Sequence, residues 1–234
     1  MSMNYDYASN VLKTFALAHN YNKWIFDMIL PHVGKRTLEV GCGTGNITGY
    51  LKDITNLTCL DREDAYIRHM RIDWQAINFI CADISDKYIY QKFPEKFDTI
   101  VCINVLEHVE NDVQSLKNIY DILDPGGKLI LFVPAMSSLY GTMDRFLSHC
   151  RRYDKNGLSD KVKNAGFEIK KINYSNFPGI FGWYLNGRLL KRKKFSILQP
   201  LIFDKFVPFI AKFEKIITPP AGMSLLCVCQ KNEK

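Results

Sequence analysis

The stretch Arg36-Thr37-Leu38-Glu39-Val40-Gly41-Cys42-Gly43-Thr44-Gly45-Asn46-Ile47-Thr48 indicates how this chain folds. The apolar run over residues 37–40 predicts a short strand, and residues 46–52 predict the opening of a helix. Three glycines at alternate positions lie between them. Glycine suits such a turn because the backbone takes positive φ angles and because a ligand can approach a main chain that carries no Cβ. The stretch therefore predicts a strand, a tight turn and a helix N-terminus beside a ligand.

The spacing of these glycines differs from that of a dinucleotide site. A nicotinamide or flavin fingerprint has the pattern G-x-G-x-x-G, whose third glycine would fall at Asn46. An NAD-dependent oxidoreductase would also need a catalytic Tyr and Lys pair, which we do not find. That class of enzyme is kept as an alternative.

Two further acids follow predicted strands. Residues 57–61 predict a second strand that ends in Asp61, and residues 77–84 predict a third that ends with Asp83. A carboxylate at the end of the second strand of a doubly wound sheet can accept hydrogen bonds from both hydroxyls of a ribose. Asp61 can also serve as a helix cap. An aspartate after a strand, such as Asp83, is often a turn former.

The middle of the chain predicts a buried strand and its successor. Residues 97–109 are almost continuously apolar, which is typical of a central strand of a parallel sheet covered by helices on both faces. A helix is expected over residues 112–123. It should end at Asp124-Pro125-Gly126-Gly127, before a strand over residues 128–133.

From Leu38 to Pro134 these motifs resemble the class I S-adenosylmethionine (SAM)-dependent methyltransferases. The matching parts are the acid and glycine spacing, the two later acids, the segment Asn104–Val109 and the segment Leu123–Leu129. The resemblance implies an α/β fold, a doubly wound Rossmann-like sheet of seven strands with the last strand antiparallel. It also implies SAM as cofactor and S-adenosylhomocysteine as product. The residues it places at the cofactor are Glu39, Gly41, Cys42, Gly43, Gly45, Asn46, Asp61, Arg62, Asp83, Ile84, Asn104, Val105 and His108.

The resemblance also implies how these residues act. The glycine turn would lie under the methionyl part of the cofactor, with Glu39 near its ammonium. Asp61 would hold the ribose and Asp83 the adenine amino group, with Ile84 supporting the ring. His108 would lie near the carboxylate of the cofactor or near the methyl acceptor, or it would only pack under the next helix.

The segment after the fifth strand should border the acceptor, because ligands bind at the carboxyl ends of strands in open α/β sheets. Residues 144–153 resemble a branch of the methyltransferases in which an aspartate precedes G-H-x-R-R-Y, with Ser148 at the glycine position. The candidate catalytic residues are His149 as general base, Asp144 orienting it, and His108. The candidate substrate-binding residues are Tyr140, Arg151, Arg152, Tyr153 and Trp183. The alternatives are a structural network in which an arginine pairs with Asp144, and methyl transfer by proximity alone.

The predicted organisation has three parts: an N-terminal helical lid over residues 1–34, a cofactor-binding core over 35–173 and 224–234, and a helical insertion over 174–223. Tyr7 or Trp24 could cover the cofactor, although such aromatics could simply cover the sheet edge. Between Phe177 and Gly222 there are 8 Lys and Arg against 2 Asp and Glu. Basic and apolar side chains over residues 188–217 suit peripheral contact with anionic lipid or a long apolar substrate. A cap over the pocket with a solvated basic rim, or a dimer face, is the alternative.

Composition narrows the class of protein. The 234 residues are 47% hydrophobic and 24% charged, which is ordinary for a globular domain. The seven cysteines are scattered without C-x-x-C spacing, so we expect neither a disulfide framework nor a metal site.

With no signal-like start and no apolar run long enough to span a bilayer, we expect a cytoplasmic protein, at most peripheral to the inner face of the membrane. The net charge of +7 is a mild bias toward anionic partners, but no RNA-binding module supports nucleic acid.

We therefore expect a biosynthetic SAM-dependent methyltransferase that transfers a methyl group to oxygen or nitrogen of a small-molecule or lipid-linked metabolite. A non-catalytic SAM-binding partner subunit would carry the same cofactor motifs and is a second alternative. The sequence predicts no oligomeric state.

Overall fold

The computed structural model describes residues 14–192 and 198–233. Tyr7, one of the two aromatic candidates for a lid, lies outside the described residues.

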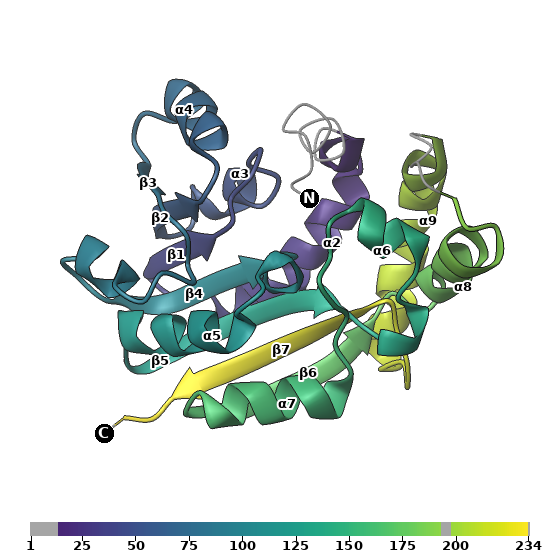
Figure 1. Cartoon of the computed structure of the whole chain (residues 1–234). Helices are drawn as coiled ribbons and strands as arrows, with labels where there is room; N and C mark the ends of the chain where they lie inside the picture. The colour runs from purple at the N-terminus through teal and green to yellow at the C-terminus, as the bar shows by residue number, and fades with distance from the viewer. Residues whose placement is uncertain (1–13, 193–197, 234) are drawn as a thin grey trace.

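A single sheet of seven strands forms the centre of the molecule, in the order β3-β2-β1-β4-β5-β7-β6 (Figure 1). All neighbours pair in parallel except β7, which lies between β5 and β6 and is antiparallel to both. The predicted fold, including the antiparallel last strand, is confirmed. The strands are β1 (Arg36–Val40), β2 (Asn56–Asp61), β3 (Asn78–Cys81), β4 (Phe97–Ile103), β5 (Leu123–Pro134), β6 (Phe167–Ser175) and β7 (Ser224–Lys231).

Helices cover both faces of this sheet, and the core is divided between the two faces. Successive residues of a central strand point to opposite faces, so Ile100 and Cys102 belong to one apolar cluster and Val101 to the other. Leu116 of α5 and Leu158 of α7 belong to the first cluster, whereas side chains of α2, α3 and α4 belong to the second. The helices are α2 (His19–Ile29), α3 (Thr48–Leu51), α4 (Asp64–Asp73), α5 (Asp112–Ile122), α6 (Thr142–Phe146), α7 (Lys155–Asn164), α8 (Gly179–Tyr184) and α9 (Leu198–Ile216).

Several boundaries differ from the sequence-based expectation: β3 is shorter than residues 77–84, and β6 extends to Ser175. α3 begins at Thr48, because the turn of the glycine motif continues past Asn46. β5 begins directly after α5 at Leu123, which pairs with Phe97 before the register shifts. Residues 124–127 therefore belong to β5 and form an irregularity in its pairing with β4, and Gly126 has a φ of 75°.

The segment between β6 and β7 folds into helices at one end of the sheet, at the right of Figure 1. α8 continues into a π-helical turn over Leu185–Leu189, and α9 follows. α9 packs against α2 through Asp204, whose carboxylate accepts hydrogen bonds from the backbone N–H groups of Asn20 (3.2 Å) and Tyr21 (2.8 Å). Within the described residues, no helix combines the length and the apolar character needed to cross a bilayer.

Candidate active site

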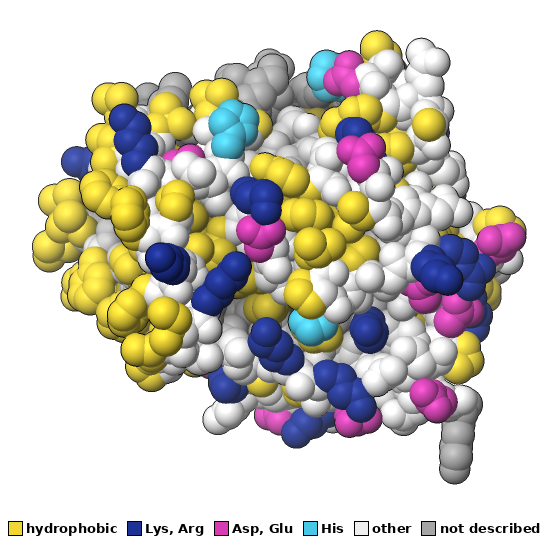
Figure 2. Space-filling view, turned by 180° about the vertical axis from the view of Figure 1, so that it is seen from behind, with side chains coloured by type: hydrophobic (Ala, Val, Ile, Leu, Met, Phe, Trp, Pro, Cys, Tyr) yellow, Lys and Arg dark blue, Asp and Glu magenta, His cyan; other side chains and the backbone are white. Residues whose placement is uncertain are grey.

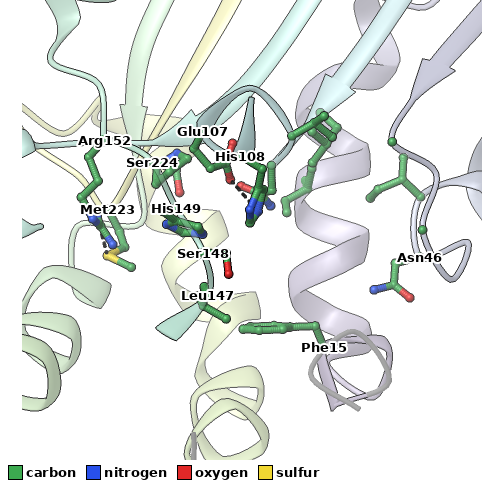
Figure 3. A pocket seen from close by; sticks show the side chains of 18 of the residues that line it. Phe15, Asn46, Glu107, His108, Leu147, Ser148, His149, Arg152, Met223 and Ser224 are labelled. Carbon is green, nitrogen blue, oxygen red and sulfur yellow. Dashed lines mark hydrogen bonds and ion pairs between the residues drawn. The ribbon is translucent and has the colours of Figure 1, made fainter. Parts of the chain in front are cut away.

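A cavity of about 1840 Å³ opens at the carboxyl ends of the parallel strands. Its walls come from the ends of β1, β2 and β4, and from α2, α6, α8 and α9; Figure 3 shows part of this lining. Pockets for a single small molecule usually measure roughly 300–1,000 Å³. The cavity is therefore large enough for a nucleoside cofactor and a second molecule together.

The glycine turn is held against the loop after β4. Gly41 has a φ of 74°, and a Cβ at this position would lie 2.2 Å from Val105 Cγ2. Both the backbone conformation and this close approach therefore require glycine. The N–H of Gly43 donates to Asp61 Oδ2 (2.8 Å), so the turn and the end of β2 fix one another. Gly45 does not line the cavity, and a Cβ at this position would meet the ring of Trp74.

Acidic side chains surround this turn. Glu39 is buried at the end of β1 and accepts a hydrogen bond from Thr48 Oγ1 (2.6 Å). Burial raises the pKa of Glu39 to about 7, although the Thr48 hydrogen bond opposes the shift. Burial also raises the pKa of Asp61, against hydrogen bonds from the N–H groups of Glu63 and Gly43. A cation or hydroxyl donors in the cavity would favour the ionised form of both carboxyl groups, Glu39 and Asp61.

Twelve of the thirteen predicted cofactor-binding residues line the cavity, and Gly45 is the exception. Asp83 lines it too, but its Oδ1 accepts hydrogen bonds from the N–H (2.8 Å) and the hydroxyl (2.7 Å) of Ser85. It therefore also forms the turn that was its alternative interpretation. Arg62 lies at the rim, where it pairs with Glu63 at 3.5 Å.

Asp144 joins the elements on the other side of the cavity. Its carboxylate accepts hydrogen bonds from Arg152 Nε (2.6 Å), the N–H of Gly141 (2.9 Å) and Trp183 Nε1 (3.1 Å), and it lies 3.1 Å from His149 Nδ1. Burial alone would raise the pKa of Asp144, but these hydrogen bonds and the charge of Arg152 outweigh burial and lower it. Asp144 is therefore an ionised, fully buried carboxylate behind the cavity wall.

Two histidines meet at this wall. The rings of His108 and His149 lie edge to face, with centroids 4.8 Å apart (Figure 3). Burial and the neighbouring His149 lower the pKa of His108 to about 3, so His108 is neutral at physiological pH. His149 has Nδ1 directed at Asp144, which leaves Nε2 for a partner in the cavity.

Glu107 lies beside the histidines, and its Oε2 has no hydrogen-bond partner among the described residues. Burial raises the pKa of Glu107 to about 7. One ligand atom from each of Glu107, His108 and His149 lies within 4.8 Å of the others, a spacing that could hold a metal ion. No metal site was expected from the sequence, because these residues come from two distant segments.

Several predicted acceptor-binding residues lie elsewhere. Arg151 turns away from the cavity and donates to the carbonyls of Val109 (2.6 Å) and Glu110 (2.9 Å). Tyr153 is buried with its hydroxyl 2.9 Å from Asp112 Oδ2. Neither residue lines the cavity, contrary to the expectation that Arg151 and Tyr153 hold the acceptor.

Arg152 reaches the cavity wall, but its side chain is fully buried against Asp144, and its guanidinium lies 4.6 Å from the ring centroid of Trp183. Tyr140 and Trp183 line the cavity as expected. Trp24 does not: it is buried beside Tyr21.

Residues that the sequence did not single out complete the lining. They include Phe15, Tyr21, Asn22 and Ile25 from the N-terminal segment, Leu147 after α6, and Asn176, Met223 and Ser224 at the two ends of the insertion. Glu107 stands within a motif that was noticed, directly before His108. Nothing local marks Asn176 or Ser224, which are brought near each other because Ser175, next to Asn176, pairs with Ser224.

Comparisons with known proteins match the central part of the chain. The family model described as a methyltransferase domain matches residues 38–131. The ubiquinone biosynthesis O-methyltransferase of Coxiella burnetii is 36% identical over 101 residues, which cover 41% of this chain and 42% of that protein. The chain thus spans less than half the length of this curated relative.

Solved structures match over nearly the whole chain, at low identity. A SAM-dependent methyltransferase from Thermotoga maritima has a TM-score of 0.66 at 17% identity, with 95% of this chain and 96% of that chain covered. A cyclase has a TM-score of 0.58 at 17% identity, with coverage of 90% and 81%. Because the same fold also occurs in a cyclase, the fold alone does not establish methyl transfer.

Proposed function

We propose that this chain is a class I SAM-dependent methyltransferase that transfers a methyl group from SAM to a hydroxyl oxygen of a small or lipid-linked metabolite. The methyltransferase-domain match over residues 38–131 and the shared fold support this proposal. One observation carries the choice of a hydroxyl: His149 lines the cavity while its Nδ1 lies 3.1 Å from the ionised carboxylate of Asp144, so Nε2 is the ring nitrogen left to accept a proton. A hydroxyl acceptor must lose a proton, and a histidine so placed can take it. The name of the Coxiella relative, an O-methyltransferase, agrees with this choice.

The residues at the strand ends fit the cofactor. Two carboxylates at the ends of neighbouring strands, Asp61 and Asp83, and a turn without Cβ atoms line one cavity. Asp61 would accept from the ribose hydroxyls, Asp83 from the adenine amino group, and Glu39 would face the ammonium. When bound, SAM supplies an electrophilic methyl group on a sulfonium.

The other side of the cavity would position the acceptor. With Nδ1 of His149 protonated toward Asp144, Nε2 accepts the hydroxyl proton, and the carboxylate stabilises the imidazolium that forms. Asp144 itself touches no ligand, because it lies behind the wall, and acts as a positioning residue. Trp183 and Tyr140 offer aromatic surface for a ring or a chain of the acceptor.

Calorimetric titration with S-adenosylhomocysteine and with NADH tests the cofactor. We expect the former to bind, and Asp61→Ala to weaken its affinity about 100-fold or more, since two hydrogen bonds to a charged group are lost. Asp53→Ala, at an exposed carboxylate paired with Lys52, is the matched control and should bind normally. Preferential binding of NADH would contradict the assignment.

Release of S-adenosylhomocysteine in the presence of phenolic and catecholic acceptors tests the reaction. His149→Gln should lower kcat by about 100-fold or more while leaving the affinity for S-adenosylhomocysteine unchanged. The exposed His69→Gln is the control. Full activity of His149→Gln would show that proximity alone carries the reaction. Cofactor binding without turnover of any acceptor would favour a non-catalytic subunit.

A further inference from the structure

Exposed apolar side chains are concentrated in the insertion. Of the twenty exposed large hydrophobic residues among those described, thirteen lie between positions 177 and 217. In Figure 2 they form a broad hydrophobic area on the side of the molecule where α8 and α9 lie, with Lys and Arg side chains next to it. Six of them recur every three or four residues along one face of α9, which we call the apolar stripe: Leu198, Ile202, Phe206, Phe209, Phe213 and Ile216.

The apolar stripe faces away from the protein because the opposite face of α9 is fixed. That opposite face carries two acids that serve as anchors. Asp204 accepts from the backbone of α2, and Glu214 accepts from the N–H groups of Asn176 (3.0 Å) and Phe177 (2.9 Å). A helix on the surface of a soluble domain normally buries its apolar face. α9 does the reverse, so its outer surface suits an apolar environment.

Cations accompany this surface. Lys205 and Lys212 are seven residues apart on α9, so both lie along one edge of the apolar stripe, and Arg188, Lys191 and Arg192 are exposed after α8. Within the described ranges, none of these five forms an ion pair with an acid. The two acids of the insertion already bind backbone groups. The surface is therefore positively charged as well as apolar.

The cavity opens beside the apolar stripe. Ile202 and Phe206 line the cavity although both are more than half exposed, so they belong to the cavity and to the outer surface at once. An apolar molecule lying against the stripe could enter the cavity without crossing a polar rim at these residues.

We propose that the apolar stripe and its flanking cations dock this protein on the surface of an anionic lipid bilayer. Apolar side chains would enter the boundary between headgroups and acyl chains, and the lysines and arginines would meet the lipid phosphates. A second copy of the chain fits less well, because an isologous interface would bring two sets of unpaired cations together. The docked enzyme would take its acceptor from the bilayer; this last step alone rests on the proposed function.

Sedimentation with vesicles tests the docking without any activity. The full chain is mixed with vesicles of phosphatidylcholine, or of phosphatidylcholine and phosphatidylglycerol, at low and high salt. We expect binding to the anionic vesicles that weakens with salt and little binding to the neutral ones. Failure to bind anionic vesicles would overturn the proposal, even if S-adenosylhomocysteine binds as expected.

Paired substitutions locate the surface. Phe209→Ser with Phe213→Ser, and Lys205→Glu with Lys212→Glu, should each weaken binding about tenfold or more. Neither pair lines the cavity, so affinity for S-adenosylhomocysteine should not change and reports on folding. Ile72→Ser on α4 and Lys163→Glu on α7, both exposed, are matched controls that should bind vesicles normally.

A different result would assign the surface to a second copy of the chain. If light scattering shows a dimer that Phe209→Ser with Phe213→Ser dissociates, while vesicle binding is unchanged, the proposal is wrong.

Discussion

Replacing Asp144 by asparagine should strongly destabilise the protein. Asp144 and Arg152 form an ion pair of 2.6 Å whose two side chains are both fully buried. Asparagine keeps the shape of the side chain but removes the charge. The Arg152 guanidinium would then lie in the interior without an anion, and its Nη2 already lacks a hydrogen-bond partner among the described residues.

The size of the effect follows from this geometry. Removing one partner of a buried ion pair costs about 3–5 kcal/mol, because the other charge stays buried and uncompensated. A domain is stable by only about 5–15 kcal/mol, so Asp144→Asn could remove much of the total. Arg152→Met removes the charge that is left behind. The double variant should therefore be more stable than the sum of the two single effects predicts.

The dependence on pH gives a second readout. The pKa of Asp144 is lowered in the folded protein from its ordinary value of 3.8. Its contribution is therefore present above that value and is lost as the pH falls through the lowered pKa. The difference in unfolding free energy between the natural protein and Asp144→Asn should be constant near neutral pH and shrink only in strong acid.

Urea-induced unfolding of the natural protein, both single variants and the double variant measures these quantities. A loss below about 1 kcal/mol in Asp144→Asn would refute the reasoning, because a surface ion pair contributes no more than that. Strict additivity of the two single variants would also refute it. Lys23→Met with Asp27→Asn, at an exposed pair on α2, is the control cycle and should show little coupling.

Three further variants test individual features of the site by the same unfolding measurement. Glu107→Gln removes a carboxyl whose pKa is raised from 4.5 to about 7, so the natural protein loses stability as the pH rises through that window. The stability of the glutamine variant relative to the natural protein should thus rise by about 2–3 kcal/mol from pH 5 to pH 8; an unchanged difference would contradict the burial of that group. Ser148→Gly should stabilise the protein by about 1 kcal/mol, because Ser148 has a φ of 58°, in a region that costs non-glycine residues energy; a loss of stability would show that the serine side chain matters more than the backbone. Gly41→Ala should destabilise by about 1–3 kcal/mol from backbone strain, beyond the clash with Val105. Adding Val105→Ala should recover only the part due to the clash, and full recovery would mean that the φ of 74° carries no cost.

The sequence alone was sufficient to predict the fold and which residues at the strand ends line the cavity. These features depend on patterns that are short in sequence: an apolar strand, a glycine turn directly after it, and an acid at the end of the next strand. Parallel strands bring their carboxyl ends to one edge of the sheet, so Gly43 and Asp61 meet although they lie 18 positions apart. The sequence also showed Ser148 in place of the glycine of the resembled motif, and the positive φ of residue 148 explains why glycine suits that position.

The side of the cavity formed by Arg152, Trp183 and their neighbours was decided by tertiary packing. Arg151, Arg152 and Tyr153 are consecutive, yet only Arg152 reaches the cavity wall, and it is paired with Asp144. The hydrogen bond from Trp183 to Asp144 joins residues 39 positions apart. No local pattern specifies which of several neighbouring polar side chains points inward.

The orientation of α9 also depends partly on the sequence and partly on tertiary contacts. Periodicity in a sequence can reveal an apolar stripe, because it follows from the 3.6-residue turn of a helix. It cannot reveal which way that stripe faces, because the hydrogen bonds of Asp204 to α2 and of Glu214 to Asn176 and Phe177 fix the orientation. Local patterns determine what each segment can form, whereas contacts between distant segments determine which face is left for a ligand or a membrane.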